Sequence, residues 1–116
     1  MTDQVCVVVG GGKGMGAAIA REMKKRNYRL SLMSPSDNCE NLAEELDGIA
    51  YRGRAETSKD TDNLIKFTME KFGRIDSLLI HVGGPPKGDL LEISEDDWKK
   101  ANELVLMPVI RLSKLI

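Results

Sequence analysis

Five glycines stand within seven residues near the start of the chain, in the segment VCVVVGGGKGMGAAIA at residues 5–20. They follow a run of β-branched residues and precede an alanine-rich segment, an order that predicts a buried parallel strand, a tight loop and a helix. Glycine lets a backbone turn sharply and approach a ligand closely, and the first turn of a helix presents unpaired N–H groups to a phosphate. The segment therefore predicts a site for the pyrophosphate of a dinucleotide.

The spacing of the glycines distinguishes between the known types of phosphate-binding loop. A Walker-type loop requires a lysine directly after its last glycine, where this sequence has Ala17, so that interpretation is excluded. The pattern GxGxxG/A fits Gly12, Gly14 and Ala17, but it begins three residues past the strand. The pattern GxxxGxG fits Gly10, Gly14 and Gly16 and begins directly at the strand end, and we favour it. A glycine-rich turn without a ligand is the remaining alternative, and the strand–loop–helix context disfavours it.

Length and composition bound the class of protein. The chain has 116 residues, with 17 Lys or Arg against 18 Asp or Glu and a formal net charge of −1, so we expect a single domain over residues 1–116 and no nucleic-acid surface. Cys6 and Cys39 lack metal-ligand spacing and predict reduced thiols, no metal site and a cytoplasmic location. We also expect no membrane segment, because no apolar run approaches the roughly 18 residues of a span.

Strand and helix patterns alternate along the rest of the chain. Strands are predicted at 5–9, 28–33, 49–52 and 77–82, and the first two helices at 14–26 and 39–46. A third helix is predicted to begin at a cap on Thr57 or Ser58 and to end at Gly73, and a fourth to begin near Glu95 after a cap on Ser94. We expect the first and the fourth strand to be buried. The alternation predicts an α/β fold of Rossmann type, a doubly wound parallel sheet with strand order 3-2-1-4 and helices on both faces. The glycine loop and the turn at 83–86 then face one crevice, at the point where the strand order reverses.

Two phrases, VGGGKGMG at 9–16 and FGRIDSLLIHVGG at 72–84, are followed by Trp98. Together they resemble the N-terminal, cofactor-binding part of a short-chain dehydrogenase/reductase, whose patterns are TGxxxGxG and FGRIDxLVNNAG. Val9 replaces the threonine, and residues 80–82 replace Asn-Asn-Ala. The resemblance covers essentially the whole chain. It implies hydride transfer between a nicotinamide cofactor and a small carbonyl or alcohol substrate.

The catalytic residues that the resemblance implies do not occur within residues 1–116. The family's asparagine in the helix after Trp98 falls on Val105, and its serine and YxxxK pair come later than residue 116. Tyr28 and Tyr51 cannot substitute for the tyrosine, because neither is followed by lysine four residues later. We therefore expect no catalytic residue in this chain. A non-catalytic NAD(P)-binding regulatory or subunit-contact module is the alternative function.

The residues expected to bind the cofactor are Gly10, Gly12, Lys13, Gly14, Met15, Gly16, Ser34, Ser36, Arg54, Ala55, His81, Val82 and Gly83. By the resemblance, Lys13 stands where NADP enzymes often carry a basic residue, and Ser34 stands where NAD enzymes place an acid. Pro35, where an arginine is frequent, and Asp37, about 20 residues past the glycines, leave NAD open. We expect NADP(H) rather than NAD(H).

Two of these positions depart from the family pattern. Arg54 stands where the family commonly has an acid that touches adenine. His81 is the only histidine of the chain, and it has no evident nucleophile or metal partner. We expect His81 to have a structural role or to contact the cofactor through its backbone.

The last helix pattern is strongly apolar and continues to Ile116 without a stop signal, with Pro108 predicting a bend. By the resemblance, this helix packs on a partner subunit, and a fifth strand covers the fourth. We therefore expect an exposed apolar edge and helix. We infer from this either a homo-oligomer formed through the helix or a chain that continues past Ile116.

Overall fold

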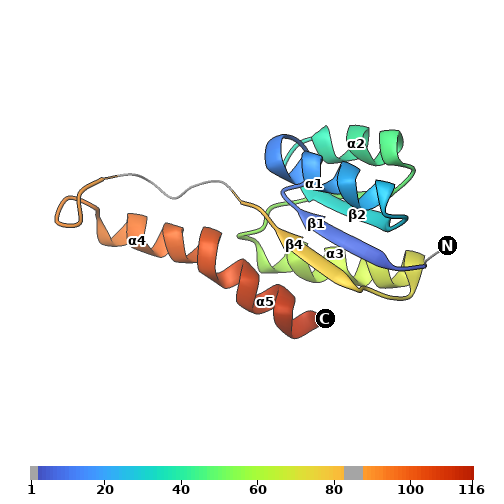
Figure 1. The fold of residues 1–116 in the computed structure, drawn as a ribbon. Coiled ribbons are helices and arrows are strands. Elements are labelled where there is room, and N and C mark those ends of the chain that lie inside the picture. Colours follow the sequence, from blue (N-terminus) through green and yellow to red (C-terminus); the bar gives the residue numbers. More distant parts are fainter. Residues whose placement is uncertain (1–2, 83–87) are drawn as a thin grey trace.

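A computed structural model describes residues 3–82 and 88–116 and shows an α/β fold around one parallel sheet (Figure 1). The strands are β1 (Val5–Val9), β2 (Arg29–Ser34), β3 (Ile49–Arg52) and β4 (Ser77–Ile80). They lie in the order β3-β2-β1-β4, which confirms the predicted topology. The register places Val9 beside Met33 and beside Ile80, so the carboxyl ends of β1, β2 and β4 meet at one edge of the sheet.

Helices cover both faces of the sheet. They are α1 (Gly14–Lys25), α2 (Asn38–Leu46), α3 (Ser58–Phe72), α4 (Glu95–Ala101) and α5 (Met107–Leu115), with a π-helical segment, η1 (Asn102–Leu106), between the last two. One apolar core joins β1 and β2 to α1 and α2, and a second joins the same strands to α3 and α5. Because helices pack on both faces of the sheet, every residue of β1 is buried, which explains why this strand is entirely apolar.

The fourth strand differs from the prediction in burial and in length. β4 is only half-buried along its length, so the prediction of a buried strand is wrong. The reason is its place in the sheet, because among the described residues β4 pairs with β1 alone and forms an edge. The strand also ends at Ile80, two residues short of the predicted end at Val82.

Two of the three predicted helix-end signals are confirmed; the third, a cap at Thr57 or Ser58, is not, because Thr57 stands at the N-cap of α3 without a side-chain hydrogen bond to the helix. Gly73 has a φ of 76° and ends α3, and Ser94 Oγ accepts a hydrogen bond from the backbone N–H of Asp97 at 3.1 Å at the start of α4. The helix containing Pro108 is irregular. It passes through η1, where Met107 N donates to Asn102 O, and Pro108, which has no N–H to donate, follows in the first turn of α5.

Both cysteines are free and buried. Burial raises the pKa of the Cys6 thiol to about 11, so this thiol is neutral at physiological pH. None of the helices in the described ranges has the length and apolarity needed to cross a bilayer.

Candidate dinucleotide-binding site

The glycine loop lies at the carboxyl edge of the sheet, between β1 and α1. The backbone N–H groups of Gly10 and Gly11 donate to Met33 O at 2.8 and 3.1 Å, and His81 N donates to Val9 O at 2.8 Å. The loop is therefore tied to the ends of β2 and β4, which fixes its position without any contribution from a side chain.

The backbone requires glycine at the positions of the favoured pattern. Gly10 has a φ of +85°, and a Cβ atom there would overlap the carbonyl oxygen of His81. A Cβ atom at Gly16 would overlap the carbonyl oxygen of Gly10, so α1 packs directly on the loop. Gly14 has a φ of +60° and open space around it. These constraints agree with GxxxGxG on Gly10, Gly14 and Gly16.

The first turn of α1 leaves its donors available. Lys13 is the N-cap residue and provides no side-chain cap, and the first turn holds no acidic residue. Ala17 N donates to Lys13 O at 3.3 Å, but the N–H groups of Gly14, Met15 and Gly16 have no hydrogen-bond partner within the part of the chain that the structure describes. Three free donors at the positive end of a helix match the needs of a pyrophosphate.

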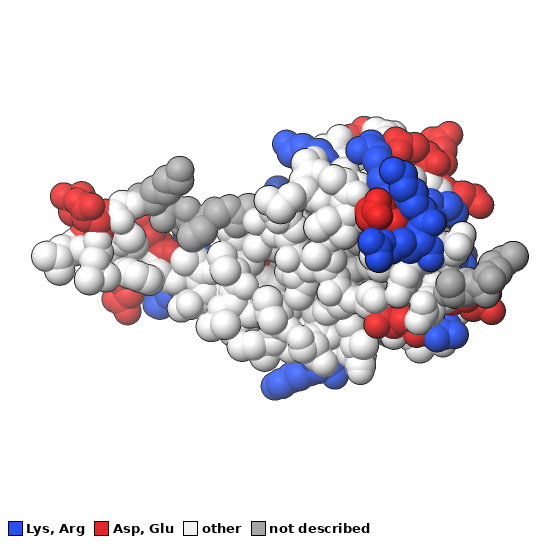
Figure 2. Space-filling model, viewed as in Figure 1, with Lys and Arg blue, Asp and Glu red and all other residues white. Residues whose placement is uncertain are grey.

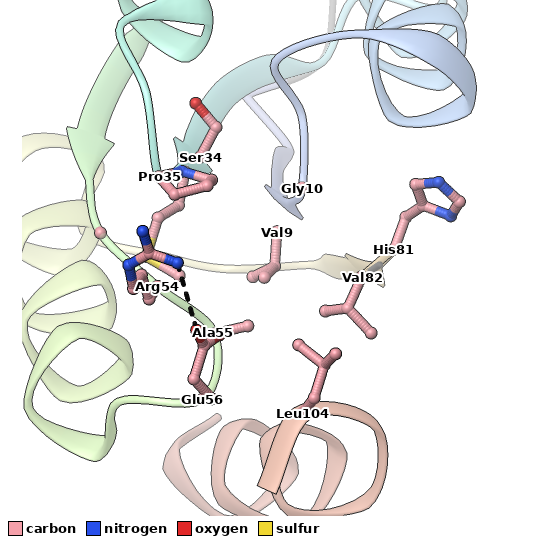
Figure 3. Close-up of a pocket in the computed structure, with 12 residues that line it drawn as sticks. Val9, Gly10, Ser34, Pro35, Arg54, Ala55, Glu56, His81, Val82 and Leu104 are labelled. Carbon is pink, nitrogen blue, oxygen red and sulfur yellow. Dashed lines mark hydrogen bonds and ion pairs between the residues drawn. The ribbon is translucent and has the colours of Figure 1, made fainter. Parts of the chain in front are cut away.

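Two cavities open along this edge of the sheet. The loop cavity, about 510 Å³, is lined by the glycine loop and the turn after β2. The β3 cavity, about 310 Å³, lies between the ends of the strands and the last helix (Figure 3). Both are lined by Gly10, Ser34, Pro35, His81 and Val82, so they form adjoining parts of one site.

The structure brings most of the predicted residues to these cavities. Gly12, Lys13, Gly14 and Ser36 line the loop cavity, and Arg54 and Ala55 line the β3 cavity. Met15 and Gly16 lie in the first turn of α1, and Met15 is exposed. Gly83 and the rest of the turn at 83–86 lie outside the described residues.

Seven lining residues were not among the predicted site residues: Val9, Met33, Pro35, Asn38, Gly53, Glu56 and Leu104. Asn38 begins α2 and lines the loop cavity, while Glu56 and Leu104 line the β3 cavity. Glu56 follows the predicted Arg54 and Ala55, and Asn38 follows Ser36, so proximity in sequence was an available signal for both. Leu104 reaches the cavity from η1, and only the folded chain reveals it (Figure 3).

The two serines of the turn after β2 differ in availability. Ser34 is buried, and its hydroxyl donates to Ser36 O at 2.9 Å and accepts from Cys39 N at 3.0 Å. Ser36 is exposed, and its Oγ accepts from Asn38 N at 3.3 Å while its own proton has no acceptor among the described residues. Ser36 is therefore the serine that presents a donor to the loop cavity.

Neither His81 nor Val105 makes a side-chain hydrogen bond within the described part of the chain. His81 is engaged through its backbone, and Figure 3 shows its imidazole turned away from Val82 and Leu104. No group of His, Cys, Asp and Glu that could hold a metal ion occurs in residues 3–82 and 88–116. Val105, which the resemblance aligns with the family's asparagine, lies in η1 and carries no hydrogen-bonding side chain.

Comparison with known proteins decides the family. The family model described as short chain dehydrogenase matches residues 4–116. The chain belongs to the short-chain dehydrogenase/reductase family. Dehydrogenase/reductase SDR family member 4 of Caenorhabditis elegans is 28% identical over 97% of this chain and 46% of its own length.

A second curated relative and one solved structure are also similar to this chain. The 3-oxoacyl-(acyl-carrier-protein) reductase of Synechocystis is 28% identical over 100% of this chain and 50% of its own length. A crystal structure of an actinorhodin polyketide ketoreductase with NADPH has the same fold, with a TM-score of 0.89 at 23% identity over 98% of this chain and 47% of that chain. The chain thus spans about half the length of the relatives it matches.

Proposed function

We propose that this chain is the nucleotide-binding part of an oxidoreductase that transfers a hydride between a nicotinamide cofactor, NADPH in preference to NADH, and a carbonyl or secondary alcohol. The observation that carries the proposal is the first turn of α1, where the N–H groups of Gly14, Met15 and Gly16 have no partner among the described residues. Gly10 and Gly16 keep side-chain atoms out of this cradle, so a pyrophosphate can reach those donors.

Each of the two cavities binds a different part of the cofactor. The free N–H groups hold the pyrophosphate, and the apolar lining of the β3 cavity, formed by Val9, Met33, Ala55 and Val82, accommodates the adenine. The bound cofactor supplies the nicotinamide carbon that gives or takes the hydride. The residues of this chain bind and orient it and keep water from its base.

Three observations support a preference for NADPH. Lys13 is exposed, lines the loop cavity and has no ion-pair partner among the described residues. Asp37, the acid that would favour NADH, lines neither cavity. The loop cavity contains no carboxylate from the described chain to accept a hydrogen bond from a ribose 2′-hydroxyl, but it offers the Lys13 ammonium and the Ser36 hydroxyl to a 2′-phosphate.

A non-catalytic dinucleotide-binding module is the second candidate. Val105 favours it, because an aliphatic side chain replaces the amide expected at that position in the family. Leu32 and Ala55, which stand four residues after the two tyrosines, favour it as well.

Calorimetric titration with NADPH and with NADH tests binding. We expect heat with both, and binding of NADPH about 10- to 100-fold tighter, the range that one charge-assisted contact provides. The absence of binding heat with either dinucleotide would contradict the proposal, and tighter binding of NADH would contradict the proposed cofactor preference. Oxidation of NADPH on addition of a series of ketones would support the oxidoreductase over the module. Binding without turnover by residues 1–116 is expected of both candidates, because neither tyrosine is followed by lysine four residues later.

A further inference from the structure

Arg54 lies beside the turn that ends β2. It follows β3 and lines the β3 cavity together with Ser34 and Pro35. Figure 3 shows its guanidinium directed toward the turn at Pro35. Lys13 lines the loop cavity, which includes the same Ser34 and Pro35. The turn at Ser34 and Pro35 therefore borders two cavities, each of which contains one cationic side chain.

The backbone fixes Arg54 in this place. Gly53 N donates to Ser34 O at 2.9 Å, which brings the residue before Arg54 into direct contact with the end of β2. Arg54 N donates to Asp60 Oδ2 at 2.9 Å, which anchors the same segment to α3. The side chain of Arg54 can change rotamer, but its starting point beside Ser34 cannot move without breaking both hydrogen bonds.

A guanidinium limits what Arg54 can bind. It has donors only, so it cannot accept a hydrogen bond from the amino group of adenine. A phosphate monoester carries about −1.5 to −2 charges and three acceptor oxygens, which complement a planar fork of donors. In a dinucleotide fold the ribose 2′-position lies near the end of the second strand, which here is Ser34. We propose that Arg54 binds the 2′-phosphate of NADPH together with Lys13, an inference that rests on the proposed function.

Glu56 competes with this phosphate. Arg54 Nη1 lies 3.5 Å from Glu56 Oε1, and the two side chains are 64% and 34% exposed, so the ion pair is long and open to solvent. Such pairs are weak, and a dianion displaces them readily. Arg111 Nη1 donates to the main-chain oxygen of Glu56 at 3.3 Å, which ties the backbone of this residue to α5.

The test compares Arg54→Ala with Arg52→Ala. Arg52 lies two residues earlier, is exposed, pairs with Glu40 at 2.8 Å and lines neither cavity, so the control removes the same charge from the same segment. Dissociation constants are measured by calorimetry for NADPH and NADH. Adenosine 2′,5′-bisphosphate and 5′-AMP serve as fragments with and without the 2′-phosphate, and thermal unfolding confirms that each variant is folded.

We expect Arg54→Ala to weaken NADPH and the 2′-phosphate fragment about 10- to 100-fold, with NADH and 5′-AMP changing less than about 2-fold. Arg52→Ala leaves all four within about 2-fold, and Glu56→Gln tightens NADPH while sparing NADH. Equal weakening of NADPH and NADH in Arg54→Ala, or no more effect than in Arg52→Ala, overturns this inference alone. Wild-type protein that binds neither dinucleotide overturns the proposed function as well.

Discussion

Gly14 and Gly16 are both required by the loop, but for different physical reasons. At Gly16 the constraint is steric, because α1 rests directly on the carbonyl group of Gly10. At Gly14 the constraint is conformational, since its φ is +60° while nothing lies within 4 Å of an added Cβ. Both glycines therefore contribute to the stability of the fold, Gly16 through packing and Gly14 through backbone conformation.

Replacing each glycine by alanine should give different losses of stability. We expect Gly14→Ala to lower the free energy of unfolding by about 1–2 kcal/mol, the cost of a left-handed conformation for an L-residue. Gly16→Ala should cost more, because α1 must move off the loop to relieve the overlap. Urea denaturation measures both, with Ala18→Gly at an exposed position of α1 as the control, expected to cost about 1 kcal/mol. Gly16→Ala as stable as Gly14→Ala would contradict this assignment.

Among the elements, β4 is attached to β1 by a carboxylate clamp at its start. Asp76 Oδ2 accepts from Val5 N at 2.8 Å and from Arg74 Nε at 2.9 Å, and Asp76 N donates to Val5 O at 2.9 Å. The Arg74 guanidinium and the Val5 N–H hold the pKa of the Asp76 carboxyl below its ordinary value. The clamp secures an edge strand that lacks a second neighbour among the described residues.

This clamp predicts a loss of stability in acid. Because the pKa of Asp76 is lower in the folded chain, its contribution is complete above the unfolded value of about 3.9 and disappears as the pH falls through the folded pKa. We expect Asp76→Asn to lower the unfolding midpoint at pH 7, and this difference from wild type to shrink below about pH 4. Asp62→Asn, at an exposed position of α3, is the control. A difference that stays constant with pH would exclude the carboxylate as the cause.

The elements also show what could be predicted from sequence. The strand–glycine–helix unit, the Gly73 stop and the Ser94 cap are local signals, and the structure contains all three. The half-burial of β4 could not be predicted, because it depends on which strands pair with it. The place of Leu104 in the β3 cavity depends on folding in the same way. Pro108 predicted an irregular helix, but not the π-helical form of η1.

Across the whole molecule, apolar surface gathers on η1 and α5. Leu112 is buried against the second core, whereas Val105, Leu106, Val109 and Ile110 are 38–51% exposed. Figure 2 shows a surface nearly free of charge in this region, while Lys and Arg residues gather over the far end of the sheet. A contiguous apolar patch of this kind is typical of an association surface. We propose that the last helix mediates homo-oligomer formation, as the sequence leads us to expect.

Sedimentation velocity can test this association on the wild-type chain and on the double variant Leu106→Glu/Val109→Glu. We expect wild type to sediment as a multiple of 12.8 kDa, and the variant as a monomer, because two carboxylates cannot be buried unpaired at an apolar interface. Met69→Glu is the matched control, since it places the same charge at a comparably exposed apolar residue on α3, outside the patch. Both positions of the variant are exposed, so its unfolding midpoint should stay close to that of wild type. A wild-type chain that sediments as a monomer at every concentration would show that this helix does not join subunits of this chain.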